Sequence, residues 1–109
     1  MALALNVFQT VTAVVPAIPT IVYSAPVGYT GVVLLAQVAN IGATSEDVTF
    51  IHRRSSTDTE LLKEYPISAN DTSSLLAGKL VLESGDQLVL SGSNASNLKF
   101  VASLLETLN

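Results

Sequence analysis

The sequence predicts an all-β protein, an eight-stranded antiparallel β-sandwich that is jelly-roll-like. Short runs rich in Val, Ile and Thr alternate between apolar and polar residues, which is typical of strands. Clusters of Gly, Pro, Asn and Ser separate these runs at intervals of roughly 8–12 residues. No segment sustains the 3.6-residue period of an amphipathic helix. The 109 residues are expected to form a single domain, 1–109.

The first half of the chain predicts four strands. Residues 6–15 alternate and are rich in β-branched side chains, and this strand could serve as an arm in assembly. Pro16 and Pro19 end it, because proline cannot donate to a ladder. Residues 29–40 place Val32, Leu34 and Ala36 on one face and Val33 and Leu35 on the other. Apolar residues on both faces predict a strand covered twice, once by the opposite sheet and once by a neighbouring subunit. The other two strands are 20–24 and 46–54.

The second half predicts four more strands. Residues 59–66 form a hairpin with 46–54 through the polar turn Ser55–Asp58, and 66–72 is expected to be a loop. The segment KLVLESGDQLVLS has alternating leucines on both sides of Gly85-Asp86, which indicates a second hairpin with strands 80–82 and 88–90. Its outward residues Val81 and Val89 are expected to meet a neighbouring subunit. The last strand is 97–105, with its inward face formed by Leu98, Phe100, Ala102 and Leu104.

The composition favours self-association. Hydrophobic residues make up 49% of the chain and charged residues 13%, against roughly 25% charged in an average domain. A domain of this size would leave part of that apolar material exposed, and large exposed apolar patches usually mark contact surfaces. We therefore expect a homo-oligomer, with a monomeric apolar sandwich as the alternative.

Charge and segment lengths exclude several classes of function. A net charge of −4 argues against nucleic-acid binding, which requires a basic face. The longest uninterrupted apolar run, 32–36, is far too short to span a membrane. The apolar N-terminal segment lacks a basic region, so it is expected to be a strand and not a signal peptide. The sequence has no cysteine, which excludes disulfides and thiolate metal sites.

Few residues offer chemistry. His52 is the only histidine and stands beside Arg53-Arg54, where cationic neighbours would repel a metal ion, so a structural or solvent-facing role is expected. Glu83 and Asp86 could bind calcium or act as an acid/base pair, but carboxylates at a turn mostly accept hydrogen bonds from turn amides. Asn70-Asp71 has the same interpretation. We expect no catalytic, cofactor-binding or metal-binding residues, and no enzyme activity.

The aromatic residues and glycosylation patterns are weak signals. Tyr23, Tyr29 and Tyr65 stand near Pro or Gly turns, where they are expected to cap the ends of the sandwich and not to form a sugar-binding platform. The acceptor tripeptides at Asn70 and Asn94 are common by chance and carry little weight.

Two parts of the chain carry a family resemblance. In the segment SAPVGYTGVVLLAQVANIG, a Pro-x-Gly turn precedes a long apolar strand that is closed by Asn-x-Gly, and the segment PISANDTSSLLAGKLVLESGDQLVL follows later. The matching positions are Pro26-x-Gly28, Asn40-x-Gly42, Pro66-Ile67, Leu75-Leu76, Gly78–Glu83 and Gly85-Asp86. Over about residues 21–106 the chain resembles small virion structural proteins of tailed bacteriophages, most strongly those of phages that infect marine cyanobacteria.

This resemblance implies a non-enzymatic virion component that is assembled in the host cytoplasm. Such a protein attaches to other virion proteins. We expect it to self-assemble first as a trimer, because capsid and fibre sites offer local threefold positions, and next as a hexamer or dimer. It would serve as a capsid decoration, neck or tail component. The alternative is a glycan- or receptor-binding module of a tail fibre. Neither role involves a cofactor, nucleic acid or a membrane.

Overall fold

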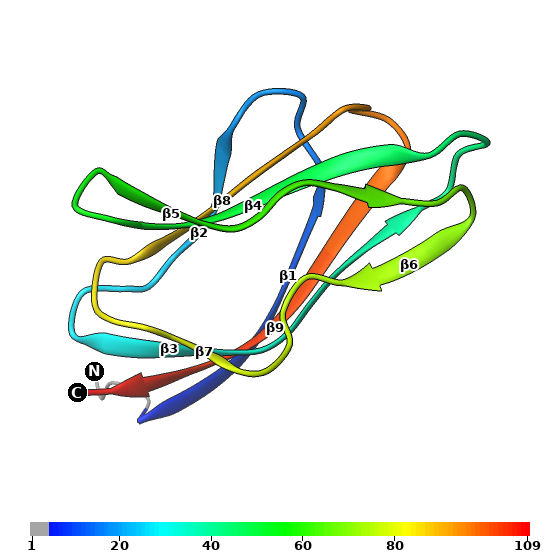
Figure 1. Cartoon of the computed structure of the whole chain (residues 1–109). Coiled ribbons are helices and arrows are strands. Elements are labelled where there is room, and N and C mark those ends of the chain that lie inside the picture. The colour runs from blue at the N-terminus through cyan, green and yellow to red at the C-terminus, as the bar shows by residue number, and fades with distance from the viewer. Residues whose placement is uncertain (1–4) are drawn as a thin grey trace.

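The computed structural model describes residues 5–109 and shows two antiparallel sheets packed face to face (Figure 1). The start of the N-terminal segment for which we expected no signal peptide, residues 1–4, lies outside the described residues. In sheet A the strand order is β1 (Asn6–Val14), β9 (Leu98–Leu108), β3 (Tyr29–Asn40) and β6 (Asp71–Ser74), and β7 (Leu80–Leu82) also pairs with β3. In sheet B the order is β2 (Thr20–Ser24), β8 (Gln87–Gly92), β4 (Glu46–Arg54) and β5 (Thr57–Ile67).

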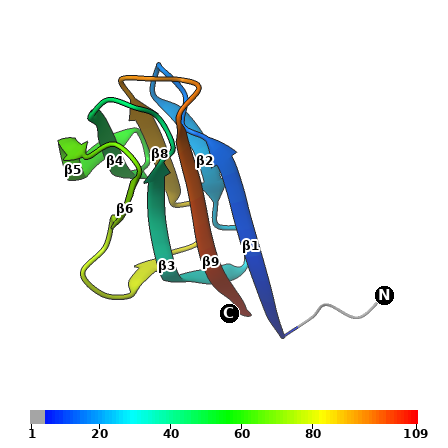
Figure 2. The same cartoon turned by 90° about the vertical axis from the view of Figure 1, so that its right-hand side faces the viewer.

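The predicted all-β sandwich is confirmed, but the described residues form nine strands and not eight. Figure 2 shows β3, β9 and β1 side by side in one layer of the sandwich. Within residues 5–109, no helix has the length and apolarity needed to cross a membrane.

The core lies between the two sheets and follows the predicted alternation of β9. Leu98, Phe100, Ala102 and Leu104 are buried, whereas Lys99 is exposed. The ring of Phe100 packs against Phe50 of β4, with 5.9 Å between ring centroids. The core therefore consists of the inward-facing side chains of both sheets, as two packed antiparallel sheets require.

A bulge in β3 overturns the predicted faces of that strand. The register with β9 shifts between Val33 and Leu35, so an extra residue enters β3 at this point. As a result Val33 and Ala36 are both buried, whereas Leu34 and Leu35 are exposed. A bulge changes the parity of the alternation, which the uninterrupted apolar run could not reveal.

The predicted hairpin around Gly85-Asp86 is wrong. The turn forms, with Gly85 at φ 87° and the Asp86 amide donating to the Glu83 carbonyl at 2.9 Å. However, β7 pairs with β3 in sheet A, and β8 pairs with β2 and β4 in sheet B. Leu82 and Leu88 thus reach the same core from opposite sheets, and the segment is a corner between the two layers.

The predicted loop 66–72 is confirmed only for residues 68–70, because strands occupy both of its ends. β5 continues through Ile67, which is buried, and β6 starts at Asp71 and pairs with β3. β6 has the sequence DTSS, so no apolar alternation marked it as a strand. The N-terminal strand pairs with β9 along its whole length, from Asn6 to Val14, as an edge strand of sheet A. Its use in assembly stays a prediction.

The hairpin of β4 and β5 is confirmed, and its turn is tighter than predicted. Arg54 pairs with Thr57, so only Ser55 and Ser56 connect the strands. Both serines have positive φ, 49° and 67°. Two-residue hairpin turns with both central residues in this region favour Asn-Gly, because these residues accept it with less strain.

Replacing Ser55-Ser56 by Asn-Gly should therefore raise the free energy of unfolding by about 0.5–1 kcal/mol. The midpoint of urea unfolding measures this change. Ser56→Val is the opposite control and should lower the midpoint, since a β-branched residue is strained at positive φ. An unchanged or lower midpoint for the Asn-Gly variant would contradict the view that the positive φ angles of Ser55 and Ser56 strain the turn.

Candidate functional site

One polar cluster brings together most of the candidate residues, at the corner between β7 and β8. The carboxylate of Asp86 is 2% exposed and accepts hydrogen bonds from three groups. Arg54 donates from Nε to Oδ1 at 2.8 Å and from Nη2 to Oδ2 at 2.6 Å. His52 Nε2 lies 3.0 Å from Oδ2, and the Glu83 amide donates to Oδ2 at 2.9 Å.

The sequence places these groups together through two local features. His52 and Arg54 continue the inward alternation of Val48 and Phe50 to the end of β4, so their side chains reach the end of the core. On the other side, the turn is fastened to the connection after β2. The Ala25 amide donates to the Asp86 carbonyl at 2.8 Å, and the Gly85 amide donates to the Ala25 carbonyl at 3.0 Å.

The electrostatics of this cluster favour a structural role. The Arg54 guanidinium holds the pKa of Asp86 well below its usual range, and the Glu83 amide and His52 lower it further. Asp86 in turn raises the pKa of Arg54. The Glu83 side chain is 70% exposed, and its carboxylate lies 3.3 Å from the same guanidinium. A carboxylate with a strongly lowered pKa is a poor proton donor or base near neutral pH, so the geometry disfavours the acid/base pair.

The arginine pair does not form a basic patch. Arg53 points to the opposite face of β4 from Arg54 and forms an ion pair with Asp58 of β5, with Nε 2.6 Å from Oδ1. Each arginine is thus matched by an aspartate from a different element. The predicted turn chemistry of Asp86 is confirmed, because it accepts the Glu83 amide, but its ion pair with Arg54, 32 residues away, was not foreseen.

Sequence reasoning missed a second buried cluster around Glu106. Glu106 is buried and accepts hydrogen bonds from the Tyr23 hydroxyl at 2.5 Å and from Gln9 Nε2 at 2.7 Å. Burial raises the pKa of the Tyr23 phenol well above its usual range, and Glu106 adds to this effect, so Tyr23 remains a donor. Glu106 continues the inward row of β9, a signal that the predicted strand end at 105 hid.

The other candidate residues are dispersed. Tyr23 on β2 is buried. Tyr29, at the start of β3 in sheet A, is half-buried, and Tyr65, on β5 in sheet B, is exposed. The three rings therefore form no common platform. Asp71 Oδ1 accepts the Thr72 amide at 2.8 Å, as predicted for turn chemistry. Asn94 Oδ1 accepts the amides of Ser96 and Asn97, which also fixes a turn.

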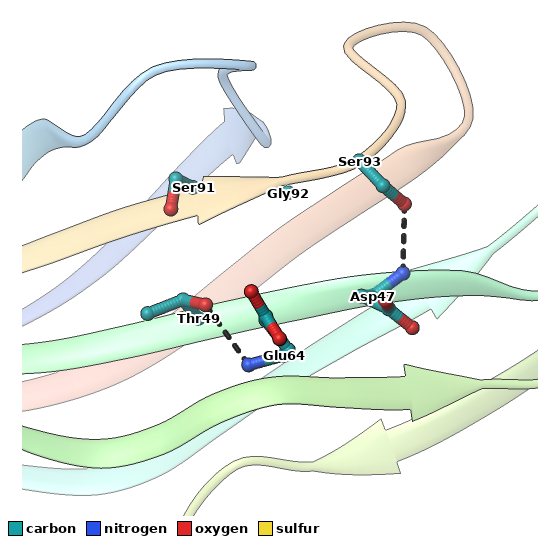
Figure 3. Close-up of a pocket in the computed structure, with 6 residues that line it drawn as sticks. All are labelled: Asp47, Thr49, Glu64, Ser91, Gly92 and Ser93. Atoms are coloured by element: carbon teal, nitrogen blue, oxygen red, sulfur yellow. Dashed lines mark hydrogen bonds between the residues drawn. The ribbon is translucent and has the colours of Figure 1, made fainter.

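The hollow shown in Figure 3 lies on the outer face of sheet B and has a volume of about 230 Å³. It is lined by Asp47, Thr49, Glu64 and the segment Ser91, Gly92 and Ser93. Two backbone donors there are already used. The Glu64 amide donates to Thr49 Oγ1 at 3.0 Å, and the Asp47 amide donates to Ser93 Oγ at 2.8 Å. Across residues 5–109, no group of three or more His, Cys, Asp or Glu side chains could hold a metal ion.

The feature that stands out is an apolar row across the outer face of sheet A. The strand registers align Phe8 with Leu105, Leu105 with Val32, and Val32 with Val81. Paired residues lie on the same face of a sheet, so the four side chains form one strip across β1, β9, β3 and β7. Phe8 is 75% exposed and Val81 is 55% exposed in the single chain. We call this strip the apolar row.

The three long strands that contribute to the apolar row carry few charges, whereas Val81 on β7 lies between the exposed residues Lys79 and Glu83. Lys99 and Glu106 are the charged residues of β1, β3 and β9, and Glu106 points inward. The exposed bulge residues Leu34 and Leu35 stand next to the row. The expectation for Val89 is wrong, because Val89 is 1% exposed between Ile21 and Ile51 on the outer face of sheet B. Among strand residues, sheet A therefore carries most of the exposed large apolar side chains, namely Phe8, Val14, Leu34, Leu35 and Val81, whereas sheet B carries Ile21 and Tyr65.

The comparisons with known proteins find a similar fold but identify no family. No protein-family model matches the chain, and no curated protein matches it. A chain in a solved structure of Bacillus endospore appendages, described as a novel family of disulfide-linked pili, has a similar fold. It matches with a TM-score of 0.56 and 14% identity, over 95% of this chain and 88% of that chain. At this level of identity the similarity shows the fold alone.

Asp86→Asn should lower the free energy of unfolding by about 2–4 kcal/mol at pH 7. The buried asparagine amide would bind the Arg54 guanidinium more weakly than the carboxylate does. The folded pKa of Asp86 is lowered, so its contribution is complete above the ordinary aspartate pKa of about 4 and is lost as the pH falls below it. Urea unfolding at pH 7, 4 and 2.5 should therefore show the difference between wild type and variant shrinking in acid.

Asp58→Asn is the matched control, since it removes the exposed partner of the neighbouring arginine and should change stability little at any pH. If both variants lowered the free energy of unfolding equally at pH 7, the special role of Asp86 would be contradicted.

Proposed function

We propose that the protein is a non-enzymatic structural subunit that assembles with copies of itself and forms part of a tailed-phage particle, as a capsid decoration, neck or tail component. The apolar row is the observation that carries the self-assembly. Phe8 and Val81 project from the outer face of a sheet whose other face is already used by the core. Monomeric proteins rarely leave a contiguous apolar strip of this kind in contact with water.

Burial of the row would supply a large driving force for association. Covering a Val, Leu or Phe side chain stabilises by about 1.5–3 kcal/mol. On the three long strands the outer face carries Lys99 as its charge, so little desolvation of ions opposes a contact over this part of the row. A closed oligomer, with a trimer favoured, hides such a face from further growth.

The architecture is compatible with this role. β6 and β7 both pair with β3, at separate parts of that strand, and together fill one strand position. Eight positions in two sheets is the number found in jelly rolls, which occur in viral capsid and lectin domains. The pilus protein with a similar fold is itself described as a component of an assembled appendage. Because one fold hosts many functions, the virion location rests on the sequence resemblance and the assembly on the apolar row.

The alternative is a glycan- or receptor-binding module of a tail fibre. It has less support, because Tyr23 is buried and Tyr65 lies on the other sheet from Tyr29. Carbohydrate binding would require another exposed aromatic surface.

Sedimentation velocity at micromolar concentration tests the assembly. The wild-type protein should sediment as an oligomer, and Phe8→Ser with Val81→Ser should raise the dissociation constant at least about 100-fold, because two buried side chains are lost. Val27→Ser is the matched control, since Val27 is 90% exposed on the connection from β2 to β3 and lies off the row. A monomeric wild-type protein would overturn the self-assembly.

The location has its own test. Mass spectrometry of purified phage particles that encode this chain should find it in fixed proportion to the major capsid protein. Absence from intact particles, with the protein present in the infected cell, would contradict a virion role.

A further inference from the structure

β1 is an unprotected sheet edge. It pairs on one side with β9, and its nine residues, NVFQTVTAV, contain no charge and no proline. The pairing from Asn6 to Val14 runs without a register shift, so the strand is regular along its length. Natural proteins usually block long regular edges with charges, prolines or bulges, because a free edge is a template for another strand.

Among the described strands, the other sheet edges are short or carry prolines, charges or bulges. β2 is five residues long and stands between Pro19 and Pro26. β5 carries Lys63 and Glu64, has Glu64 at φ 49°, and shows two register shifts against β4. The remaining edge of sheet A consists of the short strands β6 and β7, of four and three residues. Among the described strands, the contrast singles out β1.

The hydrogen bonds at its two ends show which backbone groups of β1 are free. The Val15 amide donates to the Leu98 carbonyl, and the Leu108 amide donates to the Leu5 carbonyl. Odd-numbered residues of the segment therefore direct their backbone groups toward β9, because direction alternates along a strand. The even-numbered residues Phe8, Thr10, Thr12 and Val14 direct their amides and carbonyls to the open edge.

We propose that β1 pairs antiparallel with β1 of a second copy of this chain, which joins two sheets A into one continuous sheet. The proposal rests on the proposed function, because it specifies how copies of the subunit associate. The sequence of β1 is self-complementary in one register. Phe8 pairs with Val14 of the partner subunit, and Thr10 pairs with Thr12 of the partner subunit. Each apolar side chain then meets an apolar one, and each threonine meets a threonine.

The same register satisfies the free backbone groups. Only pairs of even-numbered residues can exchange hydrogen bonds at this edge, and the four pairs in this register exchange about eight. On the inward face, Val11 lies opposite Val11 of the partner subunit. Val11 and Ala13 point toward the core but are only partly buried in the single chain, so a strand beside β1 would cover them. A shift by two residues would place Phe8 opposite Thr12 or Pro16 of the partner subunit.

The contact is twofold, because each β1 uses the same residues. It also leaves the outer faces of both sheets open, so the two apolar rows remain available. A twofold contact through β1 and a threefold contact through the apolar row would together build a hexamer.

Thr10→Pro tests the edge. It removes an amide that faces the open edge and leaves the hydrogen bonds between β1 and β9 in place, a position that tolerates proline. Thr10→Val is the matched control, since it keeps the amide. Sedimentation velocity should show a dissociation constant for the twofold contact raised at least about 10-fold in Thr10→Pro and unchanged in Thr10→Val. Unchanged assembly of Thr10→Pro would overturn the β1 contact and leave the proposed self-assembly standing, whereas a monomeric wild-type protein would overturn both.

Disulfide trapping tests the register and does not depend on the proline variant folding. The sequence has no cysteine, so any disulfide joins two engineered residues. Val11→Cys should form a covalent dimer on mild oxidation, because the paired Cα atoms fall within disulfide range. Ala13→Cys alone should not, but an equal mixture of Ala13→Cys and Gln9→Cys should. Equal trapping of Val11→Cys and Ala13→Cys, read on non-reducing gels, would overturn the register.

Discussion

The structure depends on the corner at which the chain passes from sheet A to sheet B after β7. Leu82 and Leu88 flank this corner and enter the same core from opposite layers. The corner contains a buried carboxylate, Asp86, which would be costly without partners. Arg54 and the Glu83 amide supply them, so one side chain closes the turn and ties it to β4. β8 leaves this corner and pairs with β2 on one side and β4 on the other.

The buried polar side chains have hydrogen-bond partners, whereas several apolar side chains on the outer surface stay exposed. Among the described residues, no buried side-chain nitrogen or oxygen lacks a hydrogen-bond partner. Asp86 near one corner and Glu106 on β9 both bind groups from distant parts of the chain. By contrast, Phe8 and Val81 stay largely exposed on the outer face of sheet A in the single chain. The interior is complete in one copy, and the surplus apolar surface lies where other copies can cover it.

Local patterns explain which predictions succeed. Alternation located most strands, and Ser55-Ser56 connects a hairpin as the polar turn suggested. The same rule failed in β3, where the bulge at Leu34 changes the parity of the alternation. It also missed β6, whose sequence has no apolar residue. Asp86 was correctly assigned to turn chemistry, but the Glu83 carboxylate lies against Arg54 instead, and no local pattern points to this arginine, which is distant in sequence.

The sequence by itself determined that the chain forms strands, that these strands bury one face in a common core, and that apolar residues exceed what this core can hold. These properties depend on residue type and spacing, which act over a few neighbours. Only the tertiary structure decided which strands pair, because pairing depends on packing between segments far apart in the chain. The tertiary structure placed Leu80–Leu82 and Gln87–Gly92 in different sheets and buried Val89. It also aligned Phe8, Leu105, Val32 and Val81 in one row on the outer face of sheet A.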